Sequence, residues 1–317
     1  MPRKRRRAVI DIGTNSVKLL VAEVAGGEIC PLCEDSKQTR LGKGFYTTHR
    51  LQREPVAKTA QAVAQFARGA RGWKAKSIRV IATSAARDAK NPELLLNAVK
   101  RAAGLEVEII SGEQEADWAF HGVTTDKRLA KDPLLLLDVG GGSTEFILGH
   151  GDHKHFRHSF PLGTVRLLEK IPHSDPPKTA ELNAVRKWLK NFLRTYVHPK
   201  LDPELRSEAK LDPKCGRVQL IGTGGTASIL ARMETKMQGF DRARIERTRL
   251  TLARVRAHAK MLWAMPLTER QNVIGLPRKR ADVILTGVLI YEVVMEEFGF
   301  KELRVSTRGL RFAAVMD

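Results

Sequence analysis

Two short glycine-rich segments of this sequence follow the same pattern: DIGTNS at positions 11–16 and DVGGGST at positions 138–144. Each lies between an apolar run and a second strand-like run, so each is expected to turn a β-hairpin. Glycine tolerates positive φ and lets consecutive backbone N–H groups point at one centre, which makes a site for an anion. One such turn would be an ordinary hairpin. Two copies that both begin with aspartate predict two loops that grip a phosphate chain.

The same loops carry side chains that suit a phosphate and a metal ion. Hydroxyl and amide groups add hydrogen-bond donors to the backbone N–H groups, and carboxylates suit a divalent cation. The candidate metal-binding residues of the loops are Asp11 and Asp138. The candidate phosphate-binding residues are Gly13, Thr14, Asn15, Ser16, Gly140, Gly141, Gly142, Ser143 and Thr144.

The rest of the chain alternates strand-like and helix-like segments, which predicts an α/β fold that binds ligands at its strand ends. Strands are expected at 9–24 (a hairpin that continues toward 40), 78–82, 105–110, 134–148 (a second hairpin), 155–160, 218–221 and 303–305. Helices are expected at 51–71, 91–104, 111–123, from 164, 180–197, after GTGGTAS to 233, 252–265, 281–298 and 309–316. The charged, proline-containing segment 198–216 is expected to be an exposed loop. The similar halves indicate a weak internal duplication and two domains, residues 1–128 and 129–317.

Six motifs, taken in order along the chain, are similar to those of one known family. They are DIGTNS, ATSAARDA, SGEQEA, DVGGGSTE, PLGTVRLLE and GTGGTAS. Together they resemble the exopolyphosphatase and guanosine pentaphosphate phosphatase (Ppx/GppA) family, in its short two-domain form, within the superfamily of actin, Hsp70 and the sugar kinases. The resemblance implies two actin-like (ribonuclease H-like) α/β domains with mixed sheets and an active site in the interdomain cleft. It also implies Mg²⁺-dependent removal of a terminal phosphate, and a terminal helix, about 309–317, that packs back on the first domain.

The resemblance further implies roles for individual residues. Glu115, immediately before the alanine of SGEQEA, matches the catalytic base of the family, and Arg87 matches its phosphate-facing arginine. Asp138 and Glu145 match the acids associated with Mg²⁺, or another divalent cation, and Asp11 would reach the metal through water. The motif GTGGTAS adds the phosphate-binding candidates Gly224 and Gly225, while Arg166, Arg308 and Arg311 would extend the basic lining.

The sequence also departs from the family pattern, and some of its residues have plainer explanations. Gln114 stands where many relatives have glutamate, and Phe312 and Ala313 follow Arg311 where the family has glutamate and glycine. Acidic residues such as Glu113 and Glu115 are common in the first turn of a helix without any catalytic role. By spacing alone Arg87 would form a surface salt bridge with Asp88.

The balance of charge narrows the partners that the protein is expected to bind. Lys and Arg total 55 against 35 Asp and Glu, so the formal net charge of +20 favours polyanionic ligands. An arginine-rich composition throughout the proteome would explain the same excess. Only 6% of residues are aromatic, and no basic run is interleaved with Phe or Tyr as a base-stacking surface requires, so nucleic acid is not favoured. No membrane partner is expected, homodimerisation stays open, and the expected compartment is the cytoplasm because no apolar run reaches the length of a membrane helix.

Cysteine and histidine offer a second, weaker kind of site. Cys30 and Cys33 form a CPLC motif that suits half a zinc site or a redox pair, but they fall where a strand is expected, and Cys215 stands alone. Four histidines also cluster in a turn-like segment, where a solvated turn explains them better than a metal: His150, His153, His155 and His158.

Taken together, these features predict an exopolyphosphatase that releases terminal orthophosphate from linear polyphosphate by Mg²⁺-assisted attack of water. The alternative substrate is guanosine pentaphosphate, the other activity of the family that the chain resembles. The basic charge favours polyphosphate, because a long polyanion gains from an extended positive surface whereas a nucleotide needs only a pocket. An ATP-dependent phosphotransferase and a non-catalytic polyanion binder are further alternatives, and both are disfavoured by the SGEQEA motif.

Overall fold

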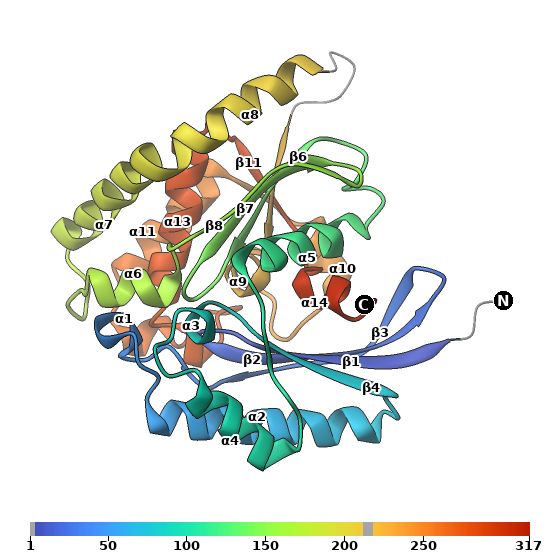
Figure 1. The fold of residues 1–317 in the computed structure, drawn as a ribbon. Coiled ribbons are helices and arrows are strands. Elements are labelled where there is room, and N and C mark those ends of the chain that lie inside the picture. Colours follow the sequence, from blue (N-terminus) through green and yellow to red (C-terminus); the bar gives the residue numbers. More distant parts are fainter. Residues whose placement is uncertain (1–3, 212–217) are drawn as a thin grey trace. The chain divides into compact units, whose positions relative to one another are not determined.

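The computed structural model describes residues 4–211 and 218–317. The chain divides into two compact units (Figure 1): a first unit of Met1–Thr125 with Gly309–Asp317, and a second unit of Asp126–Arg308. The division lies next to the boundary at 128/129 that the sequence suggests, and residues 309–317 are grouped with the first unit.

The first unit is built on a five-stranded sheet in the order β3-β2-β1-β4-β5. The first three strands of the chain are antiparallel, while β4 and β5 are parallel to β1. Their bounds are β1 (Arg5–Ile12), β2 (Ser16–Ala25), β3 (Glu28–Gln38), β4 (Ser77–Ala82) and β5 (Glu108–Ile109). Because strand side chains alternate between faces, Ile10 packs into one core of this unit and Val9 into another.

Helices cover both faces of the first sheet. Figure 1 shows α2 and α4 side by side along one face, and α5 and α14 pack together on the other, where Trp118 and Phe312 share a core with Val9. The Arg7 guanidinium, at the centre of this sheet, donates hydrogen bonds to the carbonyls of Val315 and Met316. The helices of this unit are α1 (Phe45–Thr48), α2 (Arg53–Gly72), α3 (Ser84–Arg87), α4 (Glu93–Ala103), α5 (Gly112–Thr124) and α14 (Leu310–Ala314).

The second unit repeats this plan on a six-stranded sheet in the order β10-β11-β9-β6-β7-β8. Its first three strands are again antiparallel, two further strands are parallel to β6 on the other side, and an antiparallel edge strand, β10, is added. The bounds are β6 (Leu134–Val139), β7 (Thr144–His150), β8 (His153–Phe160), β9 (Gln219–Thr223), β10 (Arg249–Thr251) and β11 (Glu302–Val305). The shared strand order makes the duplication visible, and the two sheets are mixed.

The main core of the second unit lies between one face of its sheet and a layer of helices. Leu135, Leu137 and Val305 are strand residues of this core, and α13 is buried almost all round. The helical elements are α6 (Thr164–Lys170), α7 (Thr179–Phe192), a π-helical turn (Leu193–Val197), α8 (His198–Leu211), α9 (Gly224–Glu234), α10 (Arg242–Arg247), α11 (Leu252–Trp263), α12 (Leu267–Arg270), a 3-10 turn (Arg278–Arg280) and α13 (Ile284–Glu297).

The segment 198–211 is a helix, so the expectation of an exposed loop at 198–216 was wrong there; residues 212–217 lie outside the described residues. Two prolines suggested a break, since proline inside a helix costs about 3 kcal/mol. The helix nevertheless continues through Pro203, because Val197 and Leu201 are fully buried in the core and Glu208 lies 3.2 Å from His155. Packing of an apolar face outweighs the local preference.

Further differences concern short or unexpected elements. The strand expected at 105–110 is reduced to β5, and α10 and β10 had no counterpart among the sequence-based expectations. Cys30 and Cys33 do lie on a strand, β3, and neither forms a disulfide within the described residues; Cys215 falls outside them. Among residues 4–211 and 218–317, no helix is long and apolar enough to cross a membrane.

Candidate active site

The first glycine loop is a tight connection whose carbonyl groups are held by its own unit. Gly13 N–H donates to the Ser16 carbonyl (3.0 Å), while the carbonyls of Thr14 and Asn15 accept from backbone N–H groups of the 39–42 segment. Gly13 does not adopt the left-handed φ that the sequence suggested; glycine is favoured there because a Cβ would lie 3.2 Å from the Ser16 carbonyl oxygen. The backbone therefore fixes this loop and leaves its side chains for other contacts.

Those side chains hold polar atoms that are buried without a partner. Asp11, Thr14 and Asn15 are 3–4% exposed, and Asp11 Oδ1, Thr14 Oγ1 and Asn15 Nδ2 have no hydrogen-bond partner within the described chain. Burial raises the pKa of Asp11, against the opposing charges of Lys18 and Arg311. Leaving such groups unsatisfied costs about 1–3 kcal/mol each, so the cluster has the chemistry of a ligand site.

A fourth buried polar atom of this kind lies just after the end of β4, the strand that pairs in parallel with β1. Ser84 is 2% exposed, its Oγ has no hydrogen-bond partner among the described residues, and it begins α3 just after β4. The N–H of Thr83 donates to the Ile12 carbonyl (3.2 Å), which holds the start of α3 beside the end of β1. Ser84 was missed at the sequence level, although its place in ATSAARDA, at a strand end before Arg87, was a usable signal.

Arg87 and Glu115 meet in the first unit. Arg87 Nη1 lies 2.8 Å from Glu115 Oε2 and also donates to the Ile110 carbonyl (3.3 Å). The pairing with Asp88 that spacing alone favoured is longer, 3.9 Å from Arg87 Nε to Asp88 Oδ1. Arg87 therefore links α3 to the start of α5 and fixes the Glu115 carboxylate.

Glu115 differs in burial from the other acid of the same helix turn. Ser111 caps α5 by accepting from the N–H of Gln114 (3.1 Å), which sets where the helix begins. Glu115 is 6% exposed, whereas Glu113 is an exposed residue. A surface acid that merely complements the helix dipole would remain in water, so burial beside Arg87 favours a specific role for Glu115.

The second glycine loop is braced more extensively than the first. Gly140 N–H donates to the Ser143 carbonyl (3.0 Å), and the Gly140 and Gly141 carbonyls accept from the first N–H groups of α6. Arg166 Nε donates to the Gly142 carbonyl (2.7 Å). Gly140, like Gly13, has no left-handed φ; its Cβ would lie 2.9 Å from the Ser143 carbonyl oxygen. Close backbone approach, rather than positive φ, accounts for glycine at both positions.

The acids of the second loop face one another across a hairpin. Asp138 and Glu145 are register partners on β6 and β7, so their side chains share one face of the sheet. Glu145 is 1% exposed and accepts a hydrogen bond from Ser159 Oγ (2.7 Å). Thr144 is also fully buried, and its Oγ1 donates to the Leu162 carbonyl.

This donor set suits Mg²⁺ with few protein ligands. Within the described residues no three His, Cys, Asp or Glu side chains converge on a preformed metal cage. Mg²⁺ usually keeps several waters and takes one or two carboxylates together with substrate phosphate. The Asp138–Glu145 pair, with Glu145 oriented by Ser159, meets that requirement within the second unit.

GTGGTAS forms the strand-to-helix turn between β9 and α9, beside Asp138. Gly224 has φ +81°, and a Cβ there would lie 2.4 Å from Asp138 Oδ1, so both the backbone and the carboxylate require glycine. A Cβ on Gly225 would lie 3.3 Å from Arg280 Nη2, which brings that arginine to the turn. Burial raises the pKa of Tyr291 well above its ordinary value, with a further contribution from the negative charge of Asp138. Arg280 was not among the sequence candidates.

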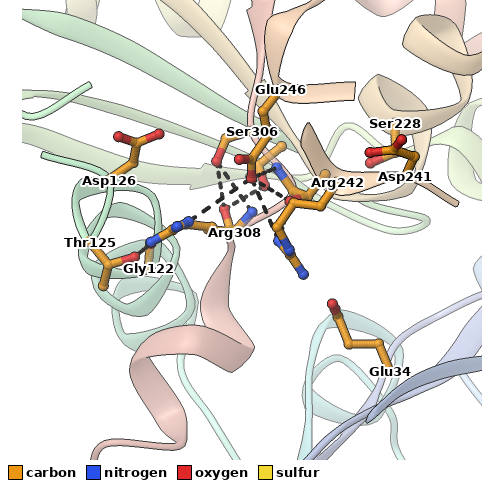
Figure 2. Close-up of polar contacts among 12 residues, drawn as sticks. Glu34, Gly122, Thr125, Asp126, Ser228, Asp241, Arg242, Glu246, Ser306 and Arg308 are labelled. Carbon is orange, nitrogen blue, oxygen red and sulfur yellow. Dashed lines mark hydrogen bonds and ion pairs between the residues drawn. The ribbon is translucent and has the colours of Figure 1, made fainter. Parts of the chain in front are cut away.

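The three candidate lining arginines have different environments. Figure 2 shows Arg308 in a polar cluster with Arg242, Glu246 and Ser306, next to the end of β11. Arg166 is tied to the second loop, as above. Arg311 instead donates to the Leu19 carbonyl (2.6 Å) and pairs with Glu34 (3.3 Å) within the first unit, which is a structural contact.

Comparisons with known proteins agree with this arrangement. The model of the Ppx/GppA phosphatase family matches residues 20–316. "Exopolyphosphatase 2" of Mycobacterium tuberculosis is 32% identical over 319 residues, which covers 96% of each chain. "Guanosine-5'-triphosphate,3'-diphosphate pyrophosphatase" of Photobacterium profundum is 26% identical over 98% of this chain and 58% of its own length.

Solved structures give the same result for the fold. The Aquifex aeolicus PPX-GPPA enzyme is 30% identical and superposes with a TM-score of 0.77 over 99% of this chain and all of its own. An exopolyphosphatase from Cytophaga hutchinsonii is 25% identical, with a TM-score of 0.84 over 98% of this chain and 97% of its own.

Proposed function

Because the chain belongs to the Ppx/GppA phosphatase family and is a phosphoanhydride hydrolase, we propose that it is an exopolyphosphatase. It releases terminal orthophosphate from linear inorganic polyphosphate, and it acts in the cytoplasm. The observation that carries the proposal is the cluster of buried, unpartnered Asp11, Thr14 and Asn15 atoms in the same unit as the Arg87–Glu115 pair. Those atoms are suited to donate to phosphate oxygens and to accept from metal-bound water.

Glu115 is the general base of the proposed reaction. It takes a proton from the attacking water while the oxygen of that water forms the new bond to the terminal phosphorus, and the shortened chain leaves with the bridging oxygen. Arg87 holds the carboxylate at 2.8 Å, and its planar guanidinium group suits a tetrahedral phosphate. Thr14, Asn15 and Ser84 supply neutral donors to the same phosphate.

The second unit supplies the metal side of the site. Asp138 and Glu145 would hold Mg²⁺, with Asp11 reaching the ion through water. When bound, the ion neutralises charge on the phosphate oxygens. Ser159 fixes the Glu145 carboxylate, and Gly224 leaves room for Asp138.

Guanosine pentaphosphate is the second candidate substrate. The similarity to the Photobacterium profundum enzyme supports it, as does the GTGGTAS turn, whose α9 N-terminus and neighbouring Arg280 suit an additional phosphate group. The net charge of +20 favours polyphosphate instead.

A comparison of substrates tests the proposal. Phosphate release is measured with Mg²⁺ from long-chain polyphosphate, guanosine pentaphosphate and ATP with a panel of sugars. We expect release from polyphosphate and no sugar-dependent ATP consumption. If phosphate were released from guanosine pentaphosphate alone, that nucleotide would be the substrate instead of polyphosphate. If phosphate were transferred from ATP to a sugar, the protein would be a phosphotransferase instead of a hydrolase.

A further inference from the structure

The second unit carries a group of arginines that hydrolysis at the glycine loops leaves unexplained. Arg249 on β10 and Arg304 on β11 are register partners in the antiparallel pair at the edge of the sheet. The charge of a third arginine, Arg128, also acts on Arg249, but Arg128 is paired with Asp126 through two hydrogen bonds (3.1 and 2.8 Å). Like charges placed opposite each other on two strands destabilise a sheet, so this arrangement reduces the stability of the edge.

The local acids compensate these charges only in part. Arg249 Nε lies 3.6 Å from Glu302 Oε1, and both side chains are well exposed to solvent (37% and 50%). Burial, followed by repulsion from Arg304 and Arg128, lowers the pKa of Arg249, while Glu302 acts in the opposite direction. Arg304 Nη1 donates to Gln219, but its Nε is buried without a hydrogen-bond partner in the described chain. Arg249 and Arg304 therefore carry more positive charge than Glu302 compensates, and Arg304 has a hydrogen-bond donor to spare.

The register places these arginines on the same face of the sheet as the metal-binding acids. Leu137 and Val305 belong to the helix-packed core on one face of the sheet. Successive residues of a strand point to opposite faces, so Asp138, which follows Leu137, and Arg304, which precedes Val305, lie on the other face. Arg304 is in register with Ile221 of β9, and Asp138 with Thr223 of the same strand, two residues further on.

The ordered strands from β6 to β10 therefore define a path along this end of the sheet, from Asp138 to Arg249. The two strands are three strand spacings apart, about 14 Å. Arg242 and Arg308 lie near the middle of that path, at the end of β11, where Glu246 holds both (Figure 2). Thr223 Oγ1 donates to the Arg308 carbonyl (2.9 Å), which ties this segment to the GTGGTAS turn.

We propose that Arg249 and Arg304 form a subsite for the distal part of a linear polyphosphate chain whose end is cleaved at the glycine loops. The inference rests on the proposed function, because the occupant is its substrate. A tripolyphosphate held at the loops is too short to follow the whole path, whereas a long chain continues along it. Planar guanidinium groups suit repeated phosphates, since each can donate two hydrogen bonds to one phosphate group.

Binding measurements in an inactive background test this subsite. Long-chain polyphosphate and tripolyphosphate are titrated against Glu115→Gln protein with and without Arg249→Gln. The matched control is Arg206→Gln, because Arg206 is an exposed arginine on α8, which packs near β8 at the opposite edge of the sheet. Arg249→Lys keeps the charge and should recover most of the affinity.

We expect Arg249→Gln to weaken long-chain binding about three- to tenfold and to reduce the slope of log affinity against log salt by about 0.7, by analogy with single-stranded nucleic acid. Tripolyphosphate affinity should change less than about twofold, and the melting temperature should stay equal or rise because a like-charge pair is removed. The Arg206→Gln control should bind both ligands as the parent does.

Three results would overturn the inference. They are unchanged long-chain affinity in Arg249→Gln, an equal loss for tripolyphosphate, and tighter Arg249-dependent binding of RNA or DNA than of polyphosphate. The proposed function fails separately, if the wild-type protein releases no phosphate from polyphosphate while Arg249-dependent binding of the long chain persists.

Discussion

The two glycine loops have the same sequence pattern and the same hairpin geometry, but their polar groups are used differently. In the first loop, Thr14 Oγ1 and Asn15 Nδ2 are buried and have no hydrogen-bond partner in the part of the chain that the structure describes. In the second loop, Thr144 donates to the Leu162 carbonyl and Arg166 to the Gly142 carbonyl. The two similar hairpins therefore differ: the side chains of the first loop suit an external ligand, whereas the second loop is braced internally.

This difference suggests a division of labour. The first unit holds both the unpartnered polar atoms of its loop and the Arg87–Glu115 pair, which suits contact with the phosphate and the attacking water. The second unit fixes two carboxylates, one of them through Ser159, which suits a metal ion. Each of the following experiments asks whether the two loops differ in this way.

The largest expected effect is in the first unit, at the base. Glu115→Gln should lower kcat by about 10²–10⁴, because the amide cannot accept the proton of the attacking water. The control is Glu113→Gln, because Glu113 lies two residues before Glu115 on the same helix and is exposed. This variant should retain most activity. Near-normal phosphate release by the Glu115 variant would show that Glu115 is not the base and would make Glu113 the candidate.

A smaller effect is expected from the metal side of the second unit. Asp138→Asn replaces a carboxylate ligand with a neutral oxygen and should raise the Mg²⁺ concentration for half-maximal activity. Ser159→Ala removes only the group that orients Glu145 and should raise it about tenfold. A magnesium titration of each variant measures both. If Asp138→Asn leaves the half-saturation point unchanged, Asp138 lies outside the metal shell and the proposed division fails.

Substrate choice depends on how far positive charge extends beyond the two loops. At low salt we expect a higher kcat/KM for long-chain polyphosphate than for guanosine pentaphosphate, and the difference should narrow as salt rises. The reason is that each phosphate contact releases counterions, so a long chain loses affinity with salt more steeply than a nucleotide. The measurement is kcat/KM for both substrates over a salt series. Equal or better use of the nucleotide at low salt would favour the alternative substrate.

Sequence patterns predicted the strands, most helices and the two hairpins well, because apolar periodicity and glycine punctuation are local signals. They failed where tertiary packing decides. Pro203 suggested a loop, yet burial of Leu201 keeps α8 helical, and β10 is too short to have a period of its own. The loop glycines were predicted for the wrong reason, since close backbone approach at Gly140 depends on atoms that meet only in the folded chain.

The smallest effect bears most directly on the two loops, and it concerns stability. Thr144→Val keeps the shape of the side chain but leaves the buried Leu162 carbonyl without its donor, which should cost about 1–3 kcal/mol of unfolding free energy. Thr14→Val removes a buried hydroxyl that has no partner, so stability should be unchanged or higher, while the KM for polyphosphate should rise. Urea unfolding and steady-state kinetics of both variants provide the test. If Thr14→Val destabilised the protein as much as Thr144→Val and left KM unchanged, the first loop would be as much a structural element as the second, and its open side chains would have no ligand to explain them.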